Sequence, residues 1–466
     1  MEIVTEELLA RQTPEARAVI GILVAQNAEL VARIAELEAK LGKDPTNSSK
    51  PPSTQHPHSK PSKQSLKKAK RKSGGQPGHA KHERALVPVE RCAEVVACVP
   101  AECRRCGKEL DGTDAEPLRH QVWEIPEIEP SIVEYQLHRL RCSCGKTTCG
   151  ELPAGVPSGA AGPRLIALSA LLMVCFRLSK RRCALFLEQV LGQEASAAWM
   201  VKLQNRAAAA LEEPYRELAK ALPQQAVLNA DESPTKEGKL KAWTWGFVAS
   251  AFTVFALRTS RKATVVDEYL GGAFTGVLGC DRAKMYWAFG KLQWCWAHLI
   301  RDFQALIDRP CGVSKRLGHD LQRPTRAMFA LWQKVRDGTL KHAEFREQMK
   351  PIRTEIENLI LRGACDGKTR AVCRELWKHR ARLWTFVDVE GVEPTNNAAE
   401  RALRPAVIWR KLCFGTQSAS GSRFVERMLT AIETCRQQEL NCFAWIAGAV
   451  EAHLAGKKAP SLVAGA

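Results

Sequence analysis

Two apolar runs, AVLNADES at 226–233 and TGVLGCD at 275–281, decide the fold of the central part of this chain. Each run is short and apolar, and the apolar part ends at an aspartate, Asp231 in the first and Asp281 in the second. Runs of this length bounded by polar residues are typical of buried strands. Further strand signals are KAWTWGFVAS at 241–250, FTVFALRT at 252–259 and LQWCWAH at 292–298, with helix signals at RKATVVDEYL (261–270) and from Leu299. The sequence therefore predicts an α/β core with mixed strands.

The two aspartates are candidate ligands for a divalent metal ion. Neighbouring strands can deliver Asp231 and Asp281 to a shared point, where hard oxygen ligands would hold the ion. Glu400, in the helical segment TNNAAER at 395–401, is the candidate third carboxylate. A strand-end aspartate more often caps a turn, and a helical glutamate more often faces water. Spacing alone leaves both interpretations open.

The segments around these runs give the domain organisation. We assign residues 224–312 and 385–428 to the α/β core, and the helical, Arg- and Lys-rich run at 313–384 to an all-α insertion. Residues 429–466 form a C-terminal helical segment. Residues 159–222 predict three or more helices, with Ser179 as a cap and Gly192 as a turn. This order is compatible with a helix-turn-helix DNA-binding domain, and equally with a small helical bundle.

Residues 87–150 predict a small β-rich module that binds zinc. The stretch VWEIPEIEPSIVEYQLHRLRC at 122–142 has the β-branched residues of short strands. Two clusters of cysteines could supply four thiolates to a closed, structural Zn²⁺ site. The proposed ligands are Cys103, Cys106, Cys142 and Cys144, with Cys149 as an alternative to Cys142 or Cys144. We expect the extra Cys92 and Cys98 to be small buried apolar residues.

Residues 1–42 predict a coiled-coil helix. An alternating spacing of three and four residues places apolar side chains at the a and d positions of heptads. Asn27 occupies an a position, where a buried Asn favours one register and one number of partners. A homo-oligomer is the expected assembly, and a single helix packed on its own protein is the alternative. The a and d residues are Ile20, Leu23, Asn27, Leu30, Ile34, Leu37 and Leu41.

Residues 43–86 form a basic, Pro-rich linker. The segment holds eleven Lys or Arg residues against Asp44 and Glu83, and too few apolar residues to fold alone. A solvated tether is the simplest role, and the densest basic cluster favours contacts with phosphate. That cluster consists of Lys67, Lys68, Lys70, Arg71 and Lys72.

The overall charge points to a polyanionic partner. The 466 residues include 69 Lys and Arg against 50 Asp and Glu, a formal net charge of +19. Nucleic acid is the first candidate and an anionic membrane surface the second. The longest apolar stretch considered, Leu165–Phe176, is too short to span a membrane, and the N-terminus lacks the order of a signal peptide. We therefore expect a cytoplasmic protein whose 17 cysteines are reduced or bind metal.

A set of motifs in conserved order resembles the insertion sequence 66 family of bacterial transposases. Ser233 stands where that family often has Thr, and the second cysteine pair is C-x-C rather than C-x-x-C. The stretches that carry the resemblance are KDPTNSSKPPS (43–53), RKSGGQPGH (71–79), the paired cysteines, ADES (230–233), GCDRAKMY (279–286), CWAHLIRDF (295–303), TNNAAERALRP (395–405) and LTAIETC (429–435).

The resemblance implies a DDE transposase with a ribonuclease-H-like catalytic core. The three acidic residues of that family then correspond to Asp231, Asp281 and Glu400, which would bind two Mg²⁺ or Mn²⁺ ions. Such a pair of ions stabilises the attacking and the leaving oxygen of a phosphodiester. His298 of the C-x-x-H pair would lie close to this site. Its alternative is a histidine buried beside Trp294 and Trp296 that makes a local hydrogen bond.

The resemblance also implies DNA as substrate, both transposon ends and target. Residues near Glu400 would then hold phosphates, and Trp409 would either stack on a base or pack in the core. Members of the family usually act with small accessory proteins in a bacterial, nucleoid-associated setting. A nuclease of the same fold that cuts without joining, and a DNA-binding regulator without activity, are the alternatives. The candidate phosphate ligands are Arg401, Arg404, Arg410 and Lys411, with Arg423 nearby.

Overall fold

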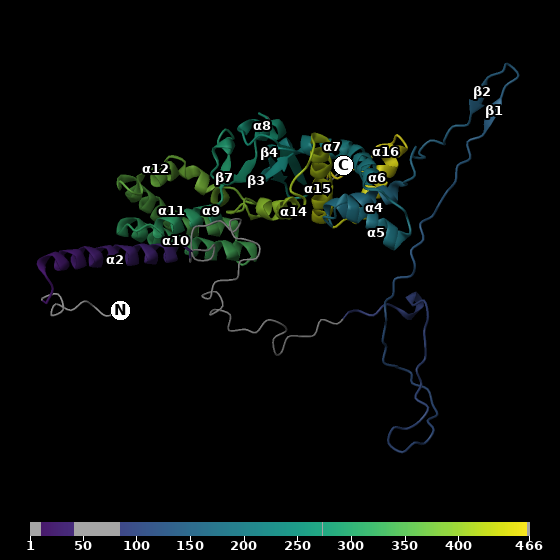
Figure 1. Ribbon diagram of the computed structural model, residues 1–466, viewed down its shortest axis with the longest axis horizontal. Coiled ribbons are helices and arrows are strands. Elements are labelled where there is room, and N and C mark those ends of the chain that lie inside the picture. The colour runs from purple at the N-terminus through teal and green to yellow at the C-terminus, as the bar shows by residue number, and fades with distance from the viewer. Residues whose placement is uncertain (1–10, 42–83, 273, 464–466) are drawn as a thin grey trace. The chain divides into compact units, whose positions relative to one another are not determined.

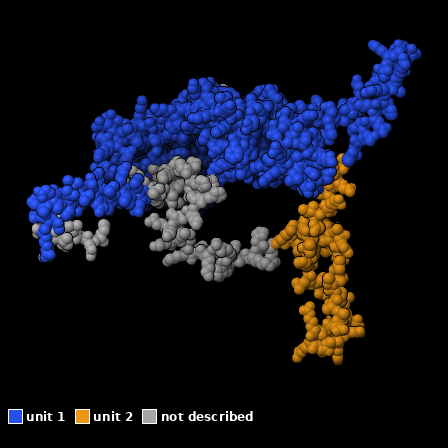
Figure 2. Space-filling view, viewed as in Figure 1, with its two compact units in different colours: residues 1–59, 132–466 blue, residues 60–131 orange. Residues whose placement is uncertain are grey.

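The computed structural model describes residues 11–41, 84–272 and 274–463 (Figure 1). The chain divides into two compact units (Figure 2). One unit comprises residues 1–59 and 132–466, and contains all the helices and strands of the α/β core. The other comprises residues 60–131.

A five-stranded mixed sheet forms the centre of the larger unit. Its strand order is β5-β4-β3-β6-β7, in which β4 runs antiparallel to both β3 and β5, while β6 runs parallel to both β3 and β7. Gly238, with φ of 57°, makes the tight turn between β3 and β4. This sheet confirms the mixed α/β class. The strands are β3 (Val227–Glu237), β4 (Leu240–Val248), β5 (Thr253–Arg258), β6 (Val277–Cys280) and β7 (Leu292–Trp294).

The apolar runs form strands because both faces of the sheet are covered. All four residues of β6 are buried, as expected for a parallel strand with helices on both sides. Trp245 and Phe247 on β4 and Trp294 on β7 are fully buried in the same core. One expectation is corrected here. Asp231 does not end its strand, because β3 continues to Glu237 by pairing with β4 alone.

Helix α15 (Ala419–Gln437) covers the edge strand β5 and takes the place of a further strand. An edge strand exposes a row of unpaired N–H groups, which must find acceptors when buried. The acceptors come from residues spaced four apart, on one face of α15. The Thr253 N–H donates to Thr434 Oγ1 (3.2 Å), the Phe255 N–H to Thr430 Oγ1 (2.9 Å) and the Leu257 N–H to Glu426 Oε2 (2.9 Å).

The helices before the sheet pack against the C-terminal helices in a second core cluster. The side chain of Ser179 caps α5 and Gly192 ends it in the left-handed conformation, as the sequence predicts, and Ser196 caps α6 in the same way. These helices are α4 (Pro163–Val174), α5 (Lys180–Leu191), α6 (Ala197–Ala210) and α7 (Glu212–Ala221), followed by the short η3 (Leu222–Gln224); their partners include α15 and α16 (Cys442–Leu454).

The remaining helices extend or cover the sheet. Helix α9 (Trp296–Ile307) begins three residues earlier than expected, so that His298 lies in its first turn. The region expected to be an all-α insertion is helical throughout its regular elements. The helices of that region are α10 (Gly312–Arg336), α11 (His342–Cys365), α12 (Arg370–Lys378) and η5 (Arg380–Leu383). The helices outside it are α8 (Ala263–Leu270), η4 (Lys284–Tyr286), α13 (Thr385–Asp388) and α14 (Asn397–Cys413).

The expectation of a β-rich module at 87–150 is wrong for the described chain. Regular structure there is limited to η2 (Val89–Arg91) and to a hairpin of β1 (Arg139–Arg141) and β2 (Thr147–Cys149). β-branched residues favour a strand only where a pleated surface is half-buried against neighbours. Here Val122, Ile125 and Ile132 are all more than three-quarters exposed.

Helix α2 (Pro14–Leu41) is the predicted N-terminal helix. Its a and d side chains Leu23, Leu30, Ile34 and Leu37 are each exposed, as is Asn27. The segment Pro14–Ala35 is also long and apolar enough to cross a membrane, by length and composition. It replaces Leu165–Phe176 as the longest apolar segment, because Ala and Val occur on several sides of the helix.

Candidate active site

The two aspartates stand at equivalent positions on neighbouring strands. β3 pairs with β6 in parallel from Val227 opposite Val277 to Asn229 opposite Gly279. Continuing this register by two residues brings Asp231 level with Asp281, which directly follows β6. Each carboxylate is oriented by a backbone N–H. Glu232 donates to Asp231 Oδ1 (2.9 Å) and Ala283 donates to Asp281 Oδ1 (2.8 Å).

Glu400 approaches the aspartates from the first turn of α14. The helix start is tied to the sheet by Asn396, whose side-chain Nδ2 donates to the carbonyl of Ala230 (2.7 Å), next to Asp231. The Asn396 backbone N–H donates to Cys295 Sγ (3.1 Å), so that the start of α9 is held as well. Helix α14 thus meets β3 and α9 at one place, although these segments are far apart in the sequence.

The electrostatics of the site indicate closely spaced carboxylates. Burial raises the pKa of Asp231 well above its ordinary value, and the negative charges of Glu232, Asp281 and Glu400 raise it further. A divalent cation would relieve both effects, because it favours the ionised form of every carboxylate around it. Three oxygen-bearing side chains of this kind fit Mg²⁺ or Mn²⁺, which prefer hard ligands.

Glu232, the neighbouring acidic residue, is occupied elsewhere. Its side chain is only 3% exposed and pairs with the guanidinium of Arg261 (Nη2 to Oε1, 2.6 Å). The Tyr286 hydroxyl donates to its other oxygen (2.5 Å). Burial raises the pKa of Glu232, while the bonds from Tyr286 and Arg261 oppose that shift. Asp231 and Glu232 project to opposite faces, as alternation along a strand requires.

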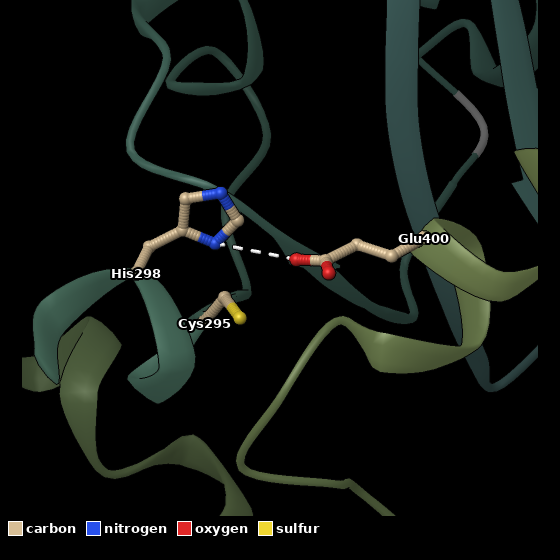
Figure 3. Close-up of side chains that lie close together, drawn as sticks. All are labelled: Cys295, His298 and Glu400. Carbon is tan, nitrogen blue, oxygen red and sulfur yellow. Dashed lines mark ion pairs between the residues drawn. The ribbon is translucent and has the colours of Figure 1, made fainter. Parts of the chain in front are cut away.

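His298 and Cys295 lie beside Glu400 (Figure 3). His298 Nδ1 is 3.7 Å from Glu400 Oε1, and Arg301 Nη2 is 3.5 Å from the same oxygen. Burial and the charge of Arg301 lower the pKa of His298, which favours a neutral imidazole. Burial raises the pKa of the Cys295 thiol, against three backbone N–H groups directed at the sulfur. Both His298 Nδ1 and Glu400 Oε1 are buried and have no hydrogen-bond partner within residues 11–41, 84–272 and 274–463.

The candidate phosphate ligands are placed differently from one another. Arg401, Arg404 and Lys411 on α14 are exposed, and Arg401 lines a cavity of about 300 Å³. Arg410 donates to the carbonyl of Pro234 on β3. Arg423 forms an ion pair with Glu426 (3.0 Å), so its guanidinium makes a contact within the protein. Trp409 is buried in the core, which agrees with the alternative that it packs there and does not stack on a base. The basic cluster at 67–72 lies outside the described residues.

Two contributors to the site went unpredicted. No role was predicted for Arg301, although a helical spacing of three residues places it on the same face as His298. No role was predicted for Asn396 either, yet it is buried and forms hydrogen bonds to two other segments. Its remaining side-chain oxygen Oδ1 has no partner among the described residues. Local sequence pattern gives no signal for bonds of this kind.

The cysteine pairs lie in two tight turns of similar sequence. Each pair is followed by Gly-Lys, with Gly107 and Gly145 at positive φ. The Cys103 N–H donates to the Lys108 carbonyl (2.9 Å), and the Cys142 N–H donates to the Lys146 carbonyl (2.7 Å). Backbone N–H groups within each turn lower the pKa of the Cys103 thiol and of the Cys142 thiol.

Comparisons with known proteins agree with this geometry. The model of the transposase IS66 family matches residues 158–423, more than half of the chain. Residues 6–85 match a family of unknown function, DUF6444. The chain is 24% identical over 416 residues to the uncharacterised protein y4qI of Sinorhizobium fredii (strain NBRC 101917 / NGR234), covering 81% of this chain and 75% of that protein. The chain therefore belongs to the IS66 family of transposases.

Proposed function

We propose that this protein is a DDE transposase that binds the ends of its element, cleaves DNA there and joins the ends to target DNA. The observation that carries the proposal is the shared register of Asp231 and Asp281, with Glu400 close enough to perturb the Asp231 carboxylate. The sheet order β5-β4-β3-β6-β7, three strands antiparallel and two parallel, is the order expected of a ribonuclease-H-like core.

In this proposal Asp231, Asp281 and Glu400 hold two divalent cations. When bound, Mg²⁺ or Mn²⁺ stabilises the attacking and the leaving oxygen of the scissile phosphodiester. The protein fixes two carboxylates through backbone N–H groups and the third through the tethered start of α14. No covalent enzyme nucleophile is needed. One site can therefore serve water in cleavage and a 3′-hydroxyl in joining.

We further propose that the exposed cations of α14 and the basic linker hold DNA phosphates. Arg401, Arg404 and Lys411 leave the same helix as Glu400 and are free of ion pairs among the described residues. Such contacts position the duplex without reading its sequence. Arg410 would join them from its position beside β3, the strand that carries Asp231.

We also propose that the two cysteine turns share one structural Zn²⁺ and that α2 pairs protomers. Matching turns with lowered thiol pKa values suit Cys103, Cys106, Cys142 and Cys144 as zinc ligands. The exposed a and d residues of α2 suit a second copy of the same helix. Two protomers could then hold two ends together, with or without small accessory proteins of the same element.

A strand-transfer assay tests the proposed function. Purified protein is incubated with Mg²⁺, a target plasmid and DNA carrying the inverted repeats that flank its gene. We expect joined products that depend on the repeat sequence. Cleavage without joining would favour the nuclease alternative, and repeat-specific binding without cleavage would favour the regulator.

A further inference from the structure

Three side chains of different chemistry converge beside the carboxylate site. Cys295 Sγ, His298 Nδ1 and a carboxylate oxygen of Glu400 all lie within 4.8 Å of one another. A thiol, an imidazole and a carboxylate are the ligands that Zn²⁺ and similar borderline-soft ions prefer, whereas Mg²⁺ disfavours the first two. Figure 3 shows the imidazole of His298 directed at the carboxylate of Glu400.

We propose that Cys295, His298 and Glu400 form a binding site for a transition-metal ion of the Zn²⁺ class, distinct from the Mg²⁺ site and sharing Glu400 with it. The strongest support is a pair of unpartnered atoms. His298 Nδ1 and Glu400 Oε1 are both buried and have no hydrogen-bond partner in the described part of the chain, which is costly unless a ligand satisfies them.

The spacing of the His298 and Glu400 ligand atoms is close to that around a tetrahedral ion. Bonds of the lengths that zinc makes to N, O and S place neighbouring ligand atoms about 3.3–3.6 Å apart. His298 Nδ1 and Glu400 Oε1 are already 3.7 Å apart. Arg301 opposes the ion, because its guanidinium is 3.5 Å from Glu400 Oε1 and would have to turn outward. Three protein ligands leave the fourth position open to water.

The backbone holds two of the ligands in place before any ion arrives. Cys295 immediately precedes α9 and His298 lies in its first turn, so both side chains meet on one side of the helix start. The Cys295 sulfur accepts the Asn396 N–H (3.1 Å) from the segment that leads into α14. Hydrogen bonds to a metal ligand fix its direction and support its affinity. The third ligand, Glu400, comes from that same helix.

The consequence for activity rests on the proposed function. Glu400 has one carboxylate, and its Oε1 is the atom that faces His298 and Arg301. With that carboxylate held by a zinc-class ion, Asp231 and Asp281 would lack their third partner. Zn²⁺ bound at this site would therefore inhibit cleavage. Excess Mg²⁺ would displace the Zn²⁺ poorly, because the thiolate and the imidazole bind Zn²⁺ more strongly than Mg²⁺.

Cobalt binding tests the site without any measure of catalysis. Co²⁺ is titrated into the full chain, and thiolate-to-cobalt absorption is followed with the stoichiometry. The zinc site proposed for the cysteine turns would take up cobalt in every variant as well, so the result is the difference in stoichiometry between variants. We expect Cys295→Ser and His298→Ala each to bind about one ion fewer than the wild type, while Cys311→Ser, at the start of another helix, binds the same number.

Equal stoichiometry and affinity in the wild type and in folded Cys295→Ser and His298→Ala would overturn the site. Circular dichroism checks folding, and His298→Ala answers the question if Cys295→Ser does not fold, because His298 is partly exposed. In a cleavage assay, Zn²⁺ should inhibit His298→Ala at least about tenfold less strongly than the wild type. Cobalt binding without cleavage activity would count against the proposed function and leave the metal site standing.

Discussion

The ionised form of Asp231 carries an electrostatic cost that a bound cation would remove. Its pKa is raised by burial and by Glu232, Asp281 and Glu400, so the native state keeps a proton that the unfolded chain releases at lower pH. The free energy of unfolding therefore falls as pH rises from the ordinary Asp pKa through the raised one. Above the raised pKa, the metal-free folded protein is destabilised by the full free energy of burying the ionised Asp231 carboxylate.

Asp231→Asn should stabilise the metal-free protein. The variant keeps the oxygen that accepts the Glu232 N–H but removes the buried charge. Its Tm should exceed that of the wild type by a margin that grows with pH through this interval, and Mg²⁺ should raise only the wild-type Tm. Thermal melts with chelator and with Mg²⁺ check this. Identical Tm values at every pH would contradict a strained carboxylate cluster.

The acidic residues of the site could be predicted from the sequence, and two of their neighbours could not. Asp231 and Asp281 each follow an apolar run, and alternation separates Asp231 from Glu232. Arg301 and Asn396 escaped prediction because their roles depend on segments about a hundred residues apart meeting in space. Such meetings leave no periodicity in the sequence.

At the scale of elements, the apolar runs and the helix cap at Ser179 were predicted and the order of the strands in the sheet was not. The strands β3 to β7 appear where the apolar runs lie, and Ser179 and Ser196 cap their helices. The order of the sheet depends on long-range pairing, which no local pattern contains. Residues 87–150 were mispredicted because β-propensity describes a half-buried pleated surface, and their apolar side chains are exposed.

Helix α2 should determine the oligomeric state. Removing residues 1–42 takes away the exposed a and d side chains and should lower the mass measured by light scattering. Asn27→Leu should raise the thermal stability of the assembly and broaden its distribution of sizes, because the buried Asn no longer selects one arrangement. An unchanged mass after truncation would assign assembly to another surface.

The cysteine turns should depend on zinc. Cys103→Ser should release about one zinc ion per chain and increase proteolysis within residues 87–150, since a structural ion contributes folding energy directly. Cys98→Ser, an exposed cysteine of the same region, is the matched control. Metal analysis and limited proteolysis measure both effects. Protein prepared without chelator that contains no zinc would contradict the site.

On the scale of the whole molecule, the excess of positive charge should appear in the salt dependence of DNA binding. Each phosphate contact changes the slope of log K against log salt by about 0.9. Replacing all five basic residues at 67–72 by Ala should therefore reduce the magnitude of the slope by about 4.5, with little change in sequence preference. Binding isotherms at several salt concentrations measure it. A slope equal to that of the wild type would remove the linker from the interface.

The central claim is that Asp231, Asp281 and Glu400 act together on a phosphodiester. The direct measurement is Mg²⁺-dependent cleavage of end-containing DNA by Glu400→Gln and Glu232→Gln, with gel-shift binding and Tm measured alongside. Glu232 is the matched control, because it is also a glutamate next to the site but pairs with Arg261 and Tyr286. Its replacement should cost about 1–3 kcal/mol of stability and little activity. We predict that Glu400→Gln slows cleavage by at least about 10²-fold while DNA binding is retained. Wild-type cleavage by Glu400→Gln, or loss of cleavage in a folded Glu232→Gln alone, would contradict the account.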